Sequence, residues 1–200
     1  MDDFSRINAA YGSFFGTSPP ARACVSTDLP QNIRVVLECI AFTAVSPASR
    51  QSLHVQSLSY WAPANIGPYS QAITVSHLSP FSAIFIKISQ VGDRIFVSGQ
   101  IGLIPASNSL PVPRSLVDEL ALSLRHIRSV TQVVKEAASI SKNAVIQGTI
   151  SWLRHSSDLI PVQHGMTASE YVCNVSLKVL GYNFYRFRYK HAAYLRCLWQ

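Results

Sequence analysis

The spacing of apolar residues predicts a helix at the start of the chain. The side chains at helical spacing are Phe4, Ile7, Tyr11, Phe14 and Phe15. Gly16 follows them and is typical of a helix C-terminus. The pair Pro19 and Pro20 then forces an extended path into the next segment.

A second, longer helix is predicted after Pro113. Ser115, with Asp118 three residues later, forms a capping-box pattern at its start. One apolar stripe follows: Leu116, Leu120, Leu124, Ile127, Val130 and Val134. The other face is basic, with Arg125, Arg128 and Lys135. We interpret this basic face as a solvated surface, and a binding role is the alternative.

Strands are predicted before the second helix and after it. Extended apolar runs occupy residues 21–25, 34–42, 94–98 and 144–153. Residues 46–59 are rich in Ser, Gln and small side chains, a composition typical of a linker. The segment 77–90 is compatible with an added strand or with an inserted loop. The pattern as a whole predicts an α+β fold with helices packed on one face of a mixed sheet.

Composition excludes some classes of protein. Of the 200 residues, 48% are hydrophobic and 14% are charged, which favours a globular chain. No run of about 18 apolar residues occurs, so a membrane span is not expected. The start at Met1 lacks the positive charge of a signal peptide. Four scattered cysteines favour free thiols in the cytoplasm, and neither they nor the six histidines form a metal-site pattern.

The net charge of +7 is concentrated near the C-terminus. No acidic residue follows Glu170, whereas five basic ones do: Lys178, Arg186, Arg188, Lys190 and Arg196. A basic, aromatic segment can contact phosphates and stack on bases. RNA binding is therefore one hypothesis, although an accessory or poorly packed end is more common for such a segment.

Five short motifs occur in the order of a known family. Residues 67–72 (GPYSQA) and 97–101 (VSGQI) resemble the start of a RidA/YjgF module, the family also called endoribonuclease L-PSP. Residues 3–15, 20–25 (PARACV) and 37–41 (LECIA) resemble the second half of the same module. The resemblance implies the RidA-like, chorismate-mutase-like fold.

The order of these halves predicts the domain organisation. Residues 1–45 match the C-terminal half of a first module, and residues 60–162 match the N-terminal part of a second. The linker 46–59 separates them, and the tail 163–200 has no counterpart in the family. A back half followed by a front half fits two incomplete modules, and it fits one circularly rearranged module equally well.

Tandem modules of this kind are most similar to the C-terminal region of eukaryotic diphthine–ammonia ligases. In that family an ATP-binding domain precedes the modules, and the enzyme uses ATP and ammonium to amidate diphthine on a translation elongation factor. The elongation factor is thus an implied partner. No SGGKDS-type phosphate loop occurs in this chain, so we expect no cofactor in it and place ATP only in a preceding domain.

The resemblance also implies a site. Arg22 matches the family's carboxylate-binding position, for which the planar guanidinium is well suited. Glu38 matches the residue that orients water, and Cys24 is a further candidate catalytic residue. The candidate substrate-binding residues are Asn8, Tyr69, Ser98 and Gly99. Because the family's pockets lie between subunits of a trimer, a small carboxylate ligand and self-association are the expected partners.

Each of these residues also has a structural interpretation. Arg22 could simply pair with Glu38 across adjacent strands. Cys24 is of a type more often buried as a small hydrophobe than used as a reactive thiol. Tyr69 could pack at a turn, and Asn8 could be a solvated helix residue. Three functions therefore stay open: a RidA-like region of a diphthine–ammonia ligase, an imine deaminase, and a non-catalytic module that binds a ligand or RNA.

Overall fold

The computed structural model describes residues 2–27, 29–41, 49–75, 94–138, 149–153, 156–158, 160–161, 175–179 and 195–199. The helices are α1 (Asp2–Phe15), α2 (Leu116–Ala137) and the short 3-10 helix η2 (Ser156–Asp158). The strands are β1 (Arg22–Ser26), β2 (Val35–Glu38), β3 (Arg50–Leu53), β4 (Ala72–Val75), β5 (Arg94–Val97), β6 (Thr149–Leu153), β7 (Val175–Val179) and β8 (Leu195–Trp199). Within the described part, neither long helix is apolar enough to cross a membrane.

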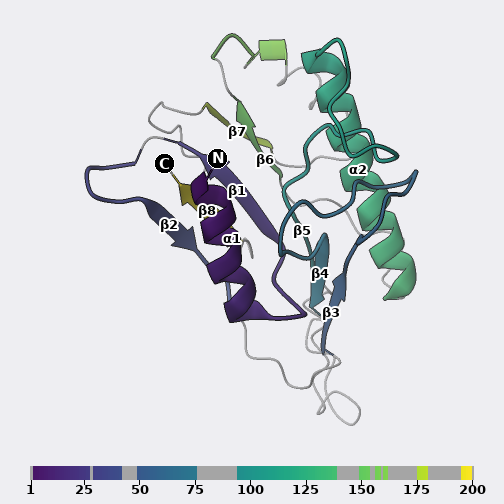
Figure 1. Ribbon diagram of the computed structural model, residues 1–200. Coiled ribbons are helices and arrows are strands. Elements are labelled where there is room, and N and C mark those ends of the chain that lie inside the picture. Colours follow the sequence, from purple (N-terminus) through teal and green to yellow (C-terminus); the bar gives the residue numbers. More distant parts are fainter. Residues whose placement is uncertain are drawn as a thin grey trace, which may run out of the picture.

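The described strands form three sheets (Figure 1). In the first, β8 lies between β1 and β2, parallel to β1 and antiparallel to β2. In the second, β3, β4 and β5 pair antiparallel in that order. β6 and β7 form a parallel pair. The predicted α+β class is confirmed, with both parallel and antiparallel pairing among the described strands.

Both predicted helices are present, and their ends follow the local signals. Gly16 ends α1 in the left-handed conformation, with φ at 60°, and its N–H donates to the Gly12 carbonyl at 3.0 Å. At the start of α2, the Asp118 N–H donates to Ser115 Oγ at 3.4 Å. α2 packs against β4 and β5, whereas α1 lies over the β1–β8–β2 sheet (Figure 1).

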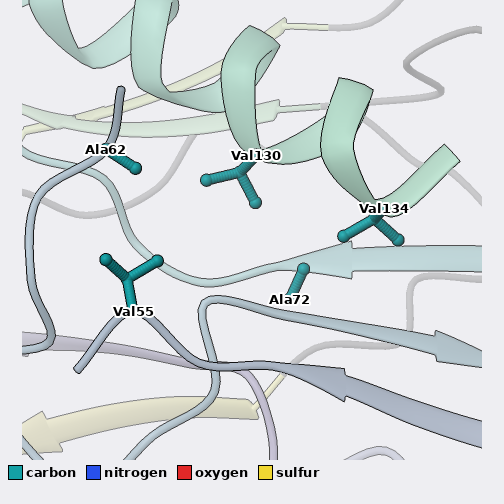
Figure 2. Close-up of a cluster of buried hydrophobic side chains, with 5 residues drawn as sticks. All are labelled: Val55, Ala62, Ala72, Val130 and Val134. Atoms are coloured by element: carbon teal, nitrogen blue, oxygen red, sulfur yellow. The ribbon is translucent and has the colours of Figure 1, made fainter. Parts of the chain in front are cut away.

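An aliphatic core lies between α2 and the β3–β4–β5 sheet (Figure 2). Its buried members are Val55, Ala62, Ala72, Val130 and Val134. Two of them, Val130 and Val134, belong to the stripe predicted for α2. The first residue of that stripe, Leu116, is 39% exposed, so only the C-terminal part of the stripe reaches the core.

The first sheet joins the second sheet where β1 begins. The Ser70 N–H donates to the Pro20 carbonyl and the Gly99 N–H to the Arg22 carbonyl, both at 3.1 Å. Arg50 on β3 adds a hydrogen bond from Nη2 to the Pro19 carbonyl at 3.2 Å. The chain just before β4 and just after β5 is therefore bonded to the start of β1, which brings residues 20–22 into direct contact with residues 70 and 99.

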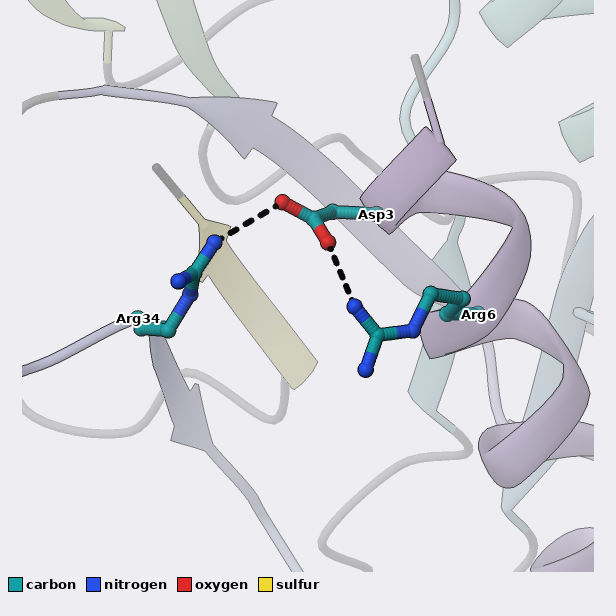
Figure 3. A network of polar contacts seen from close by, with 3 residues as sticks. All are labelled: Asp3, Arg6 and Arg34. Atoms are coloured by element: carbon teal, nitrogen blue, oxygen red, sulfur yellow. Dashed lines mark hydrogen bonds and ion pairs between the residues drawn. The ribbon is translucent and has the colours of Figure 1, made fainter.

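An exposed ion-pair network ties α1 to the chain that enters β2. Asp3 accepts from Arg6 Nη1 at 3.1 Å and from Arg34 Nη2 at 3.2 Å, one arginine on each carboxylate oxygen (Figure 3). The Arg34 side chain is 77% exposed. The network therefore links α1 to the chain before β2 on the exposed surface and is not part of the buried core.

Two segments differ from the prediction. The stretch 46–59, predicted as a linker, contains β3 and the core residue Val55, because Leu53 and Val55 have apolar neighbours to pack against. The tail 163–200 contains β7 and β8, and β8 supplies the central strand of the first sheet. The segment 77–90 and most of the basic tail lie outside the described residues.

Candidate functional site

Arg22 is buried where the start of β1 meets the chain that follows β5. It is the first residue of β1, and only 3% of it is exposed. Its Nη2 donates to Asn8 Oδ1 on α1 at 2.7 Å. The structure thus brings together Arg22 and Asn8, which the sequence motifs assigned to one site.

Two aromatic rings lie against the Arg22 guanidinium. Its central carbon is 4.4 Å from the centroid of the Tyr11 ring and 5.8 Å from that of Tyr69. Both distances are within the range in which a cation is attracted to a ring face. Phe15, one turn after Tyr11 on α1, contacts the Tyr11 ring with a centroid separation of 4.5 Å. Tyr69 lies far from Arg22 in the sequence, so the site is assembled from distant parts of the chain.

A glycine allows the backbone to approach the guanidinium closely. A Cβ atom added at Gly67 would lie 3.0 Å from Arg22 Nη2 and 3.4 Å from Asn8 Nδ2. Any side chain at this position would push against the donor group that Arg22 presents to Asn8. Glycine at this position thus allows the chain to approach the guanidinium without pressing on it.

The charge of Arg22 is not neutralised by a carboxylate among the described residues. The ion pairs in that part of the chain are those of Arg6, Arg34 and Arg114. Nη1 of Arg22 is buried and has no hydrogen-bond partner there. Burying a guanidinium without a counter-ion opposes folding, since the charge loses its hydration. An unsatisfied buried donor of this kind is uncommon and fits a site that receives an anion.

Tyr69 does not act as the counter-ion. Burial raises the pKa of the Tyr69 phenol above its ordinary value of 10.0. The hydrogen bond that the phenol oxygen accepts from the Ile66 N–H and the positive charge of Arg22 both act to lower this pKa. The phenol is therefore neutral near pH 7 and can only supply a dipole or a ring face to the site.

Ser98 and Gly99 lie next to Arg22 but contribute in different ways. The Gly99 N–H is bonded to the Arg22 carbonyl. The Ser98 hydroxyl is buried and donates to Gln71 Oε1 at 3.1 Å, and it accepts from Gln100 Nε2 at 3.0 Å. These two hydrogen bonds hold the Ser98 side chain in a buried polar network with Gln71 and Gln100. In this arrangement Ser98 positions the glycine turn and has no described contact with Arg22.

Cys24 and Glu38 are placed differently from the core of the site. Cys24 is a partly buried cysteine on β1, two residues from Arg22 and hence on the same face of the strand. Glu38 is exposed on β2. Because β8 lies between β1 and β2, the strands are not adjacent, and the alternative pairing of Arg22 with Glu38 is not formed. Two strand spacings, about 10 Å, separate β1 from β2.

Two contacts of Arg22 were not predicted from the sequence, those with Tyr11 and with Gly67. Tyr11 occurs in an apolar helix stripe, which by itself indicates only core packing. Its proximity to Arg22 depends on how α1 crosses β1, which no local motif encodes. The described residues contain no group of three or more His, Cys, Asp or Glu side chains that could hold a metal ion.

Known proteins with similar sequences point to the same family of modules. No family model matches the chain. The diphthine–ammonia ligase of Schizosaccharomyces pombe is 35% identical over 142 residues, which are 70% of this chain and 20% of that protein. The Saccharomyces cerevisiae ligase is 32% identical over 183 residues, 80% of this chain and 25% of that protein. This chain is related to the diphthine–ammonia ligases. It spans a quarter or less of their length.

The relationship extends to a RidA-type enzyme. The mouse 2-iminobutanoate/2-iminopropanoate deaminase is 35% identical over 89 residues, 44% of this chain and 50% of that protein. The crystal structure of RidA from a Psychrobacter species covers 66% of this chain and 85% of its own, with 22% identity and a TM-score of 0.42. The sequence relatives confirm the predicted resemblance: the chain is similar both to diphthine–ammonia ligases and to a RidA-type deaminase.

Proposed function

We propose that this chain is the RidA-like region of a diphthine–ammonia ligase and that its Arg22 site binds a small ligand through a carboxylate. One observation carries the second part: Arg22, which is only 3% exposed, has a buried Nη1 with no hydrogen-bond partner and no carboxylate partner among the described residues. A ligand carboxylate would supply both the charge and the missing acceptor. Hydrogen bonds of this charge-assisted kind are about twice as strong as neutral ones.

The neighbours of Arg22 suit this role. Asn8 holds one terminal nitrogen, which fixes the rotation of the planar fork. Tyr69 brings a neutral phenol from a distant part of the chain. The site is therefore cationic, partly aromatic and assembled from residues far apart in sequence, which is a suitable setting for a small 2-oxo or 2-imino acid.

Calorimetric titration of the purified chain with 2-oxobutanoate tests the proposal. We expect binding by the wild type and a loss of about 30-fold or more for Arg22→Ala, because a charge-assisted bond contributes roughly 2 kcal/mol. Arg22→Lys should recover only part of the affinity, since it keeps the charge and loses the fork. Arg34→Ala, which removes an exposed arginine, is the matched control. Equal affinity of Arg22→Ala and wild type would refute the role of Arg22.

The first part of the proposal concerns the division of labour in the ligase. ATP activation is assigned to the part of the ligase outside the matched region, so the chain alone should show no diphthine-dependent ATP hydrolysis. A phosphate-release assay with and without diphthine-bearing elongation factor measures this directly. Diphthine-dependent phosphate release by the isolated chain would contradict the assignment.

Imine hydrolysis is the second candidate function, and the identity to the mouse deaminase favours it. In that reaction water adds to the C=N bond, ammonia leaves and a 2-oxo acid forms. The proposed water-orienting residue, Glu38, is exposed on a strand separated from β1, so the described geometry favours binding over hydrolysis. A coupled assay that generates 2-aminoacrylate would show an Arg22-dependent rate if the chain is a deaminase, and no such rate if it only binds.

A further inference from the structure

We infer that Tyr11 is a positioning residue of the Arg22 site, whose ring face stabilises the buried guanidinium in place of a carboxylate and so leaves its N–H donors available to a ligand. This inference rests on the anion-binding function proposed above. Tyr11 does not need to touch the ligand. Its effect is on where Arg22 lies and on how much the buried charge costs.

The geometry distinguishes Tyr11 from the other ring at the site. The Arg22 central carbon is 4.4 Å from the Tyr11 centroid, whereas the 5.8 Å distance to Tyr69 is near the outer limit of about 6 Å for a cation–π contact. Tyr11 is also the more buried of the two, with 7% of its surface exposed. A cation–π contact gains strength when water is excluded, so Tyr11 supplies the larger share of the stabilisation.

The Tyr11 ring is itself held in place. Phe15 packs on it with a centroid distance of 4.5 Å and an interplanar angle of 44°. Phe15 thus packs on Tyr11, and Tyr11 packs on Arg22, so the three side chains connect α1 to β1. A Cβ added at Gly12, next to Tyr11, would lie in van der Waals contact with Pro68 at 3.6 Å. α1 therefore also lies close to the GPY turn.

A ring face and a carboxylate would have different consequences for function. A protein carboxylate would neutralise Arg22 and occupy two of its five N–H donors, which would weaken its attraction for a ligand anion. A ring face attracts the cation through its quadrupole and accepts no in-plane N–H bond. With Asn8 bonded at Nη2, the buried Nη1 remains for an incoming anion. Tyr11 therefore allows Arg22 to stay charged in the folded protein while its Nη1 keeps no protein acceptor among the described residues.

Two variants and one control separate the ring from the hydroxyl. Tyr11→Leu removes the ring, Tyr11→Phe keeps it, and Phe14→Leu removes an aromatic residue that is 81% exposed on the same helix. By titration with 2-oxobutanoate, we expect Tyr11→Leu to bind about 10- to 30-fold more weakly, while Tyr11→Phe and Phe14→Leu stay within about 3-fold of wild type. Affinity for the neutral analogue 2-oxobutanamide should change much less.

A second series guards against loss of folding in Tyr11→Leu. Phenylalanine carrying one, two or three ring fluorines at position 11 weakens the quadrupole in steps with little change in shape. The affinity for 2-oxobutanoate should fall stepwise along this series. A flat series, an unchanged Tyr11→Leu, or equal losses for 2-oxobutanoate and its amide would each overturn the inference. If instead the wild type fails to bind, or Arg22→Ala binds as the wild type does, the proposed function itself fails.

Discussion

The two sheets that carry a long helix are filled in opposite ways. Between α2 and β3–β5 lies an aliphatic core, in which Val130 is completely buried. Between α1 and β1 the buried residues include Arg22 and Tyr11, and the outer strand β2 keeps Leu37 55% exposed. One region buries hydrocarbon, and the other buries a charge.

This difference separates stability from function. Burial of the aliphatic side chains contributes roughly 25 cal/mol for each Å² removed from water. Burial of Arg22 works against folding, because no described carboxylate compensates it. The aliphatic core of the α2 region therefore stabilises the fold, whereas the α1 region contains the destabilising buried charge that we propose binds a ligand. The predictions below test this division.

The largest effect is expected where the loop after β5 meets α2. A Cβ added at Gly102 would lie 2.5 Å from both Cα and the carbonyl oxygen of Glu119, so Gly102→Ala must displace the loop or the helix. Overpacking against backbone should lower the free energy of unfolding by about 3 kcal/mol. Urea denaturation measures it, with the exposed Ser107→Ala as control. An unchanged midpoint would show that this contact is not tight.

A smaller effect of opposite sign is expected for Arg22→Met. Methionine fills similar space without a charge, and replacing buried ions by apolar residues is often neutral or stabilising. We expect a gain of about 1 kcal/mol in the free energy of unfolding, together with loss of 2-oxobutanoate binding. Urea denaturation and titration on the same sample test both. A variant less stable than the wild type would mean that the guanidinium supports the fold and is not a functional cost.

Local signals in the sequence predicted the helices well. The capping pattern at Ser115 and the glycine at position 16 lie at real helix ends. The Arg22 motif, Asn8 and Tyr69 were assigned to one site through a family resemblance, and they do meet in the structure. Short motifs are informative at these positions because each position requires a particular residue type, which can be read directly from the sequence.

Long-range pairing could not be predicted. Nothing in the composition of the tail indicates that β8 pairs with both β1 and β2, since the pairing depends on backbone hydrogen bonds that carry no residue signature. The short strand β3 was not predicted because its residues are mostly polar, so it lacks the apolar pattern of a strand. The contact of Tyr11 with Arg22 depends on the crossing of α1 over β1, so the residue appeared only as part of an apolar stripe.

Acidification should destabilise the α2 region more gently. His126 is completely buried on α2 and bonded through Nε2 to the Leu103 carbonyl at 2.8 Å, while Nδ1 has no described partner. Burial lowers the pKa of His126 below its ordinary 6.5, and nearby Arg125 acts in the same direction, against the hydrogen bond. The unfolded chain therefore binds the proton at a higher pH than the folded chain does.

The sign of the pH dependence follows from this difference. The contribution of His126 is complete above about pH 6.5 and declines as the pH falls through the window below that value. Urea midpoints between pH 7.5 and 5 should therefore fall for the wild type, and fall less for His126→Gln, which cannot be charged. Parallel curves for the two proteins would show that the acid sensitivity comes from elsewhere.

The smallest effect is expected for Arg34, the exposed arginine just before β2. Arg34 has a carboxylate partner in Asp3, but its side chain is 77% exposed, so solvent screens the pair (Figure 3). Arg34→Ala should cost about 0.3 kcal/mol in the free energy of unfolding, and added salt should remove most of that difference. Asp3→Asn is the matched control, because it removes the negative charge from both ion pairs of the network. A larger cost that persists in salt would place real stability in the α1 region and weaken the contrast between a paired, dispensable arginine and the unpaired, buried Arg22.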